Sequence, residues 1–184
     1  MSKTTVWTKQ HKNILDILNR EGRYIVKREY IVEKMQDISK FYLDVYDWYA
    51  NAASVFVPKP PDVRYPIWVS LAPESVIALD DGTVLLELEL DESQVIEVDY
   101  DKWGYIVNYR YIPTGPEDAL EHKKMLEKYG VDDAQAYMSN FYPIIKKQII
   151  KSWDRLFDKS NAKPSDVKMG TIWEVKKEWI KSIQ

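Results

Sequence analysis

Residues 6–26, VWTKQHKNILDILNREGRYIV, decide the fold class of this chain. Val6 to Gln10 is typical of a short buried strand, and the stretch from His11 to Arg20 predicts an amphipathic helix because its apolar residues recur at helical spacing. Gly22 stands where a helix closes in the left-handed conformation, and the chain from Arg23 to Val26 is expected to be extended again. A strand, a helix and an extended return predict a fold that mixes both kinds of element.

The rest of the chain extends this pattern. Residues 83–90 give the clearest strand, because Val84, Leu86, Leu88 and Leu90 alternate with a second face that carries Glu87 and Glu89. Further strands are predicted over residues 67–71, 95–98 and 170–175, with a short tail over 178–183. Further helices are predicted over residues 28–36, 39–54, 116–128, 132–139 and 143–158. The order predicts an α+β fold, one domain over residues 1–184 with a small mixed or antiparallel sheet and several packed helices.

Composition limits the class of protein. The 184 residues are 45% apolar and 30% charged, which is ordinary for a globular domain. Cysteine is absent, which excludes disulfides, thiolate metal sites and cysteine nucleophiles and is consistent with a reducing compartment. No stretch approaches the roughly 18 apolar residues of a membrane span, and the N-terminus does not resemble a signal peptide. We therefore expect a cytoplasmic protein without a membrane partner.

Charge is uneven along the chain. Residues 74–133 hold 16 acids and 5 bases, whereas residues 141–184 hold 10 bases and 5 acids. Two interpretations stay open: the two segments attract each other within one fold, or the basic segment meets an anionic ligand. General nucleic-acid binding is not expected, because the isoelectric point of about 5.5 is low for a protein that neutralises phosphates.

Several kinds of catalytic site are excluded by pattern. His11 and His122 stand far apart and outside any metal-ligand spacing, so no metal site is predicted. No glycine-rich phosphate loop and no G-x-S-x-G elbow occurs. Glu87 and Glu89 share a strand face, which is typical of a solvated surface. Glu174 is more unusual, because a carboxylate within an aromatic and apolar stretch needs either a solvent face or a partner.

Short motifs spread over the chain resemble one family. They are Trp7-Thr8-Lys9-Gln10, Tyr65-Pro66-Ile67-Trp68, the strand 84–90, the stretch 103–109 and Trp173-Glu174-Val175. The resemblance is to family 3841 of the domains of unknown function, a bacterial and phage family. It implies no established activity.

A weaker similarity is to ADP-ribosyltransferase-like folds, in which an early strand contacts NAD and a late strand carries a catalytic glutamate. That similarity implies that Thr8 or Gln10 contacts the nucleotide, that Arg23 or Tyr24 lines the pocket, and that Glu174 is catalytic. Such a carboxylate stabilises an oxocarbenium-like centre, while aromatic rings clamp the nicotinamide. NAD would then be the ligand.

Two functional hypotheses follow, and whether the protein is an enzyme stays open between them. The first is a non-catalytic or degenerate protein-interaction module, indicated by 7 Trp and 13 Tyr against 4 Phe and by the rigid proline loop at residues 57–65. It predicts exposed rings at Trp48, Tyr65 and Trp68 for a protein partner. Trp68 has a second interpretation, as a ring that holds the proline loop against the sheet. The alternative is the NAD-binding enzyme, in which Trp68 contacts the ligand.

Overall fold

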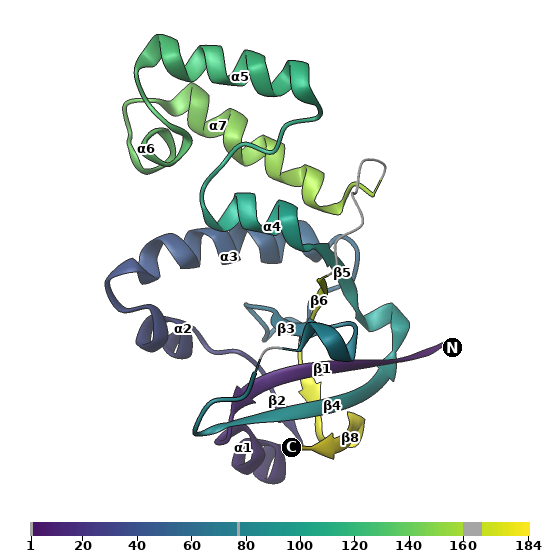
Figure 1. Ribbon diagram of the computed structural model, residues 1–184. Helices are drawn as coiled ribbons and strands as arrows, with labels where there is room; N and C mark the ends of the chain where they lie inside the picture. The colour runs from purple at the N-terminus through teal and green to yellow at the C-terminus, as the bar shows by residue number, and fades with distance from the viewer. Residues whose placement is uncertain (1, 77, 160–166) are drawn as a thin grey trace. The chain divides into compact units, whose positions relative to one another are not determined.

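A computed structural model describes residues 2–76, 78–159 and 167–184, drawn in Figure 1. These residues fall into two compact units. The sheet unit comprises the described residues up to Val98 together with those from Val167 onward, and the helical unit runs from Asp99 to Lys159. Strands and helices are both plentiful, which confirms the predicted α+β class. One domain over residues 1–184 stays a prediction.

The sheet unit is built on a six-stranded sheet. Its order is β5 (Ile96–Asp99), β6 (Lys168–Ile172), β3 (Ile67–Ser70), β1 (Lys3–His11), β4 (Thr83–Asp91) and β8 (Ile180–Ile183). β1 and β4 are antiparallel over their whole length, from Lys3 opposite Asp91 to His11 opposite Thr83. Both contain the strands predicted from the sequence, and both are longer than predicted because the cross-strand pairing continues past the apolar run.

One face of the sheet packs against α1 (Ile14–Glu21). Ile14 and Leu18 are buried among apolar side chains of four strands, which are Val6, Ile67, Val69, Leu86, Leu88, Leu90 and Ile172. α1 ends as predicted at Gly22, whose φ of 70° is left-handed and whose N–H donates to the Leu18 carbonyl at 2.9 Å. The helix therefore covers the side of the sheet on which the alternating leucines of β4 lie.

The other face meets α3 (Ser39–Ala53), which follows α2 (Arg28–Met35). Tyr49 of α3 is fully buried, and its hydroxyl lies 2.7 Å from Oγ1 of Thr171 on β6. Its ring centroid lies 5.4 Å from that of Trp68 on β3. Because Trp68 and Thr171 are opposite each other in the β3–β6 ladder, these contacts fix α3 over the middle of that ladder.

The late strand differs from its prediction. Residues 170–175 do not form one strand: β6 ends at Ile172, and β7 (Val175–Lys176) pairs with β2 (Arg23–Tyr24) in a separate two-stranded sheet. Ile172 and Val175 are three residues apart and both reach the same apolar core, which a straight strand with its two-residue period does not allow. The chain bends between them, and Glu174 lies in this bend rather than in a strand.

The predicted exposure of three aromatic rings is wrong in part. Tyr65 is 0% exposed, because it packs with Ile31 and Leu43 in a small core of its own. Trp48 and Trp68 are half-buried. The proline loop is held from another side, since Nε1 of buried Trp173 donates to the Val57 carbonyl at 2.8 Å.

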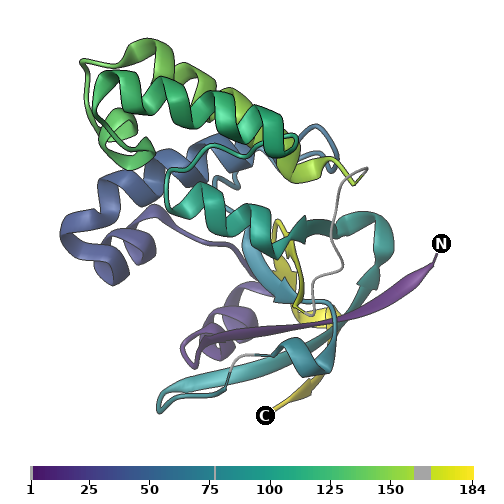
Figure 2. The same ribbon diagram turned by 45° about the horizontal axis from the view of Figure 1, so that its top comes forward.

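The helical unit contains α4 (Tyr100–Val107), α5 (Pro116–Tyr129), α6 (Asp133–Met138) and α7 (Pro143–Ser152). α7 continues into the 3₁₀ turn η4 (Trp153–Phe157), so the helix predicted over 143–158 is regular only in its first part. The buried side chains of the unit include Ile106, Ile112, Tyr137, Ile145, Ile149, Trp153 and Leu156. α5 and α7 lie side by side in both views (Figures 1 and 2).

The remaining 3₁₀ turns are short. They are η1 (Gln36–Ile38), η2 (Pro73–Ser75), η3 (Glu92–Gln94) and η5 (Lys177–Trp179). η5 leads directly into β8, so the predicted tail over 178–183 is in fact an edge strand that pairs with β4.

Candidate functional site

Glu174 and Arg23 lie together, although 151 positions separate them in the sequence. The Nε of Arg23 donates to the Glu174 carboxylate, and the Glu174 side chain is only 13% exposed. Nζ of Lys176 lies 3.6 Å from the same carboxylate. Glu174, to which the ADP-ribosyltransferase resemblance assigns a catalytic role, is thus paired with the two cations Arg23 and Lys176.

Arg23 has a second acidic partner in the proline loop. Its Nη1 and Nη2 donate to the two carboxylate oxygens of Asp62 at 2.6 and 3.2 Å. The hydrogen bonds from Arg23 lower the pKa of Asp62 and, in return, raise the pKa of Arg23. Arg23 therefore joins the bend at Glu174 to the proline loop. The role of Asp62 as a partner of Arg23 was not predicted from the sequence.

The other predicted ligand-binding residues lie elsewhere on the sheet. Thr8 is buried and donates from Oγ1 to the Trp68 carbonyl at 2.8 Å, and Nε2 of Gln10 donates to the same Oγ1 at 2.9 Å. Thr8 shares the face of β1 that carries Val6, whereas the Trp68 ring lies on the opposite face against Tyr49. The Thr8 and Trp68 side chains are therefore separated by the sheet itself.

Tyr24 is largely buried beside the sheet. Its ring stacks on that of Tyr30 with centroids 6.3 Å apart and planes 6° apart. Burial raises the pKa of Tyr24 to about 12, so the hydroxyl stays protonated to a more alkaline pH than that of an exposed tyrosine.

Two classes of site find no support in the described residues. In residues 2–76, 78–159 and 167–184, no cluster of three or more His, Cys, Asp or Glu side chains has the geometry to hold a metal ion. Among the helices that the structure describes, none has the length and apolar character that crossing a membrane requires.

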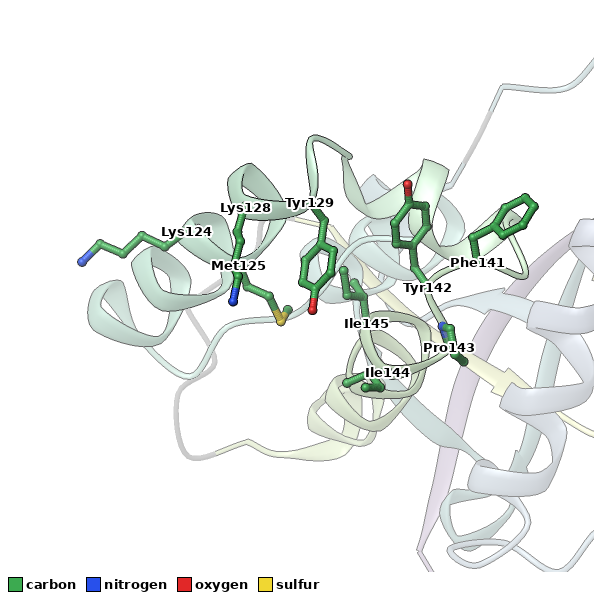
Figure 3. A pocket seen from close by; sticks show the side chains of 9 residues that line it. All are labelled: Lys124, Met125, Lys128, Tyr129, Phe141, Tyr142, Pro143, Ile144 and Ile145. Atoms are coloured by element: carbon green, nitrogen blue, oxygen red, sulfur yellow. The ribbon is translucent and has the colours of Figure 1, made fainter.

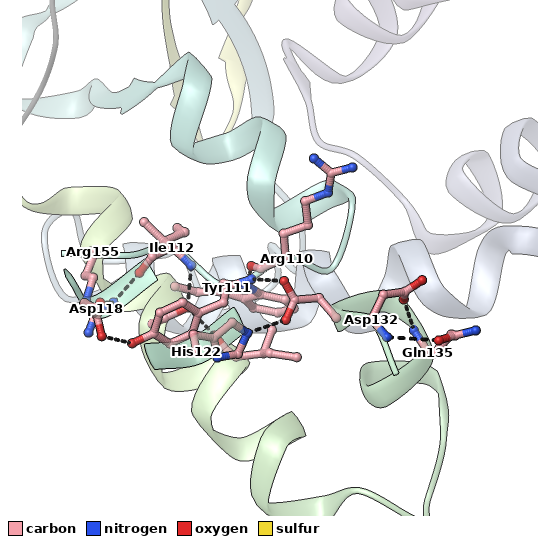
Figure 4. A network of polar contacts seen from close by, with 12 residues as sticks. Arg110, Tyr111, Ile112, Asp118, His122, Asp132, Gln135 and Arg155 are labelled. Carbon is pink, nitrogen blue, oxygen red and sulfur yellow. Dashed lines mark hydrogen bonds and ion pairs between the residues drawn. The ribbon is translucent and has the colours of Figure 1, made fainter. Parts of the chain in front are cut away.

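The helical unit holds a dense polar network, shown in Figure 4. Nε2 of His122 on α5 lies 2.6 Å from Oδ1 of Asp133 on α6, and both side chains are largely buried. The imidazole ring stacks on Tyr111 with centroids 4.0 Å apart. The second oxygen of Asp133 accepts the Tyr111 N–H at 3.2 Å. These contacts tie α5 and α6 to the segment that precedes α5.

Asp118, in the first turn of α5, is the second centre of this network. Its carboxylate accepts hydrogen bonds from the Tyr111 hydroxyl at 2.8 Å and from the Thr114 N–H at 2.7 Å. Nη1 of Arg155, in η4, lies 3.3 Å away. Burial raises the pKa of Asp118, but the hydrogen bonds from Thr114 and Tyr111 and the charge of Arg155 lower it more, so the pKa lies below its ordinary value. The network thereby fixes α5 relative to η4, the continuation of α7.

A groove of about 490 Å³ lies between the two helices held in this way (Figure 3). α5 contributes Lys124, Met125, Lys128 and Tyr129, and the opposite wall is formed by residues 141–145. Figure 3 shows the Met125, Tyr129 and Ile145 side chains pointing toward one another. The volume is within the range of about 300–1,000 Å³ that is usual for ligand pockets.

The apolar residues around this groove are exposed. Phe141 is 89% exposed, Ile144 69% and Tyr129 51%. Leu120 on α5 and Met138 on α6 are also exposed, although neither lines the groove. Single exposed apolar side chains are common, but a contiguous set around a hollow marks an interaction surface.

Sequence reasoning missed this groove, although part of its signal is in the sequence. The buried line of α7 is set by Ile145, Ile149 and Trp153, and Ile144 falls outside it, as does Phe141 before the helix. Apolar residues off the buried line of an amphipathic helix predict an exposed patch. The partner wall could not be read in the same way, because the pairing of α5 with α7 is a tertiary contact.

The comparisons with known proteins give a family and nothing beyond it. The family model named "Domain of unknown function (DUF3841)" matches residues 5–181, almost the whole chain, which confirms the resemblance noted in the sequence. The chain therefore belongs to this family. Searches of curated proteins and of solved structures found no match.

Proposed function

We propose that this member of the DUF3841 family is a non-catalytic protein-interaction module that binds a partner polypeptide in the groove between α5 and α7. The observation that carries the proposal is the exposure of Phe141, Ile144 and Tyr129 around one hollow. Burying a large apolar side chain is worth about 1.5–3 kcal/mol. A partner that covers these three side chains gains enough to offset part of the entropy lost on association.

The groove is also held ready to bind. The His122–Asp133 pair and the hydrogen bonds to Asp118 tie α5 to the segments around it. Rigid walls reduce the ordering cost of binding, because little conformational freedom remains to be lost when a partner docks. This arrangement favours a surface that receives a partner over one that rearranges to form.

Site-specific photo-cross-linking tests the proposal. A photoreactive amino acid is placed at Ile144 in the groove, and in a control protein at Lys59 in the proline loop, and both are irradiated in extracts of the source cells. We expect one defined polypeptide to be joined to the Ile144 protein and not to the Lys59 protein. No adduct at Ile144, or an adduct only with a second copy of this chain, would refute the proposal.

A second candidate is the NAD-binding enzyme, and the observation in its favour is the pairing of Arg23 with Glu174. We propose a direct test by thermal melting with NAD. At a hundred times its dissociation constant a ligand adds about 2.7 kcal/mol, which raises the Tm of a protein of this size by several degrees. An unchanged Tm at millimolar NAD would rule this candidate out.

A further inference from the structure

The charge of the groove indicates what kind of partner fits it. Lys124 and Lys128 are one helical turn apart on α5 and both line the groove, and the described residues that line it include no Asp or Glu. Lys123, which does not line it, lies 3.8 Å from Glu127 in an ion pair within the helix. The α5 wall therefore carries two lysines at the edge of an apolar surface: the Lys128 ammonium lies 6.0 Å from the centre of the Tyr129 ring, and the Lys124 side chain extends outward from the groove (Figure 3).

The opposite wall is uncharged at its side chains. Residues 141–145 contribute aromatic, proline and isoleucine side chains only. They include the first turn of α7, where Pro143 is the first helical residue and the preceding Tyr142 makes no capping hydrogen bond with its side chain. The partial positive charge of this helix end has the same sign as the two lysines. Both walls thus favour a ligand that is apolar on one side and negatively charged at its edges.

The backbone of the walls decides between a helical and an extended ligand. Both walls are formed by helices, or by the turn leading into one, and helical backbone groups bond within their own segment. Such walls offer no free strand edge, so an extended peptide would leave its own backbone groups without partners. An α-helix satisfies its backbone internally and brings side chains alone to the groove.

We propose that the partner segment is an amphipathic α-helix with an acidic flank. Its apolar side lies between α5 and residues 141–145, and its Asp or Glu residues meet Lys124 and Lys128. The groove residues of α5 run from Lys124 to Tyr129, which is about 8 Å at 1.5 Å per residue, so a partner helix contacts this wall over about one and a half turns. This inference rests on the proposed function, because it specifies the partner of the same groove.

A pair of synthetic peptides tests the charge and the helix together. Both are about 15 residues long and end-capped, with leucines at i, i+3, i+4 and i+7. One carries glutamates beside the leucines and the other carries lysines at the same positions. We expect fluorescence anisotropy at low salt to give a Kd about tenfold lower for the acidic peptide, and the difference to shrink as salt is added.

Matched variants of the protein locate the effect. Lys124→Glu and Lys123→Glu make the same charge change at adjacent positions of α5, but only Lys124 lines the groove. Lys124→Glu should remove the preference for the acidic peptide, and Lys123→Glu should keep it. Ile144→Asp should weaken the binding of both peptides, with circular dichroism showing that the helices remain.

The outcomes separate this inference from the proposed function. Equal binding of both peptides, or equal effects of the two lysine variants, would overturn the acidic partner. Failure of both peptides while photo-cross-linking at Ile144 still yields a distinct polypeptide would overturn the helical partner and leave the interaction module standing. Self-association that Ile144→Asp abolishes and the acidic peptide does not displace would assign the groove to a second copy of the chain and overturn both.

Discussion

Replacing Asp118 with alanine tests whether the polar network holds the helical unit together. The carboxylate accepts from the Tyr111 hydroxyl and from the N–H and hydroxyl of Thr114, and it pairs with Arg155. Hydrogen bonds to a charged group contribute about 1.5–3 kcal/mol each. The Asp118 side chain is 28% exposed and the contacts are neighbours, so their contributions do not add fully. We expect the free energy of unfolding to fall by about 3 kcal/mol.

Urea denaturation followed by circular dichroism and by tryptophan fluorescence measures this change. The matched control is Glu121→Ala, an exposed position on the same helix, where a surface substitution should change stability by less than about 0.5 kcal/mol. If Asp118→Ala stays within about 0.5 kcal/mol of the original protein, the network does not stabilise the unit and the argument for a preformed groove fails.

The pH dependence of the same variant gives an independent check. The pKa of Asp118 is lower in the folded than in the unfolded protein, so its stabilising effect is complete above the unfolded pKa of about 3.9 and is lost as the pH falls through the folded value. The stability difference between the original protein and Asp118→Ala should therefore be constant at neutral pH and shrink below about pH 4. A difference that grows on acidification would contradict the assigned contacts.

Three further predictions concern the sheet unit and α4. Gly170→Ala should lower the free energy of unfolding by about 1–3 kcal/mol, because its new Cβ would lie 2.7 Å from a carbonyl oxygen of β5. In the control Gly104→Ala, in α4, the new Cβ meets nothing within 4 Å, so the change should be neutral or stabilising. Equal Tm values for the two variants would exclude the close approach at Gly170. Glu174→Ala should lower the free energy of unfolding by about 2 kcal/mol, since Arg23 loses a charged acceptor, and an unchanged urea midpoint would mean that the pair is not structural. The pKa of Tyr24 is raised to about 12 in the folded protein, so its stabilising effect is complete below pH 10 and decreases as the pH rises to 12. Tyr24→Phe should therefore make the urea midpoint fall less steeply between pH 10 and 12. An unchanged dependence of the midpoint on pH would contradict the burial of the Tyr24 hydroxyl.

Regular elements were predictable where a pattern stays local. The alternation along β4 and the spacing in α1 depend only on neighbouring residues, and both elements form, although α1 begins at Ile14 because the predicted first residue, His11, is still part of β1. The glycine that closes α1 was also predictable, because a left-handed helix end has a strong residue preference. These features set the fold class and one face of the sheet.

Other features depend on contacts between distant residues. The end of β6 at Ile172 was not predictable, because the apolar run over residues 170–175 is typical of one strand. Only the structure shows that Ile172 and Val175 are buried in the same core, which requires a bend between them. The burial of Tyr65 has the same cause, since it depends on packing against α2 and α3. Of the candidate site residues, Arg23 and Glu174 form an ion pair although they lie near opposite ends of the sequence. The groove was not predicted, because its walls come from α5 and from residues 141–145, which come together only in the folded protein.

The neighbouring positions of β5 and β6 have a consequence for protein engineering. These strands are adjacent in the sheet, yet the entire helical unit lies between them in the sequence. Adjacent strands are about 5 Å apart, and the close approach of Gly170, in the middle of β6, to the Ile96 carbonyl at the start of β5 shows this pairing. The helical unit is thus an insertion in the sequence of the sheet unit, which supplies the chain on both sides of it. A glycine-serine linker from β5 to β6 in place of the helical unit should therefore let the sheet unit fold alone.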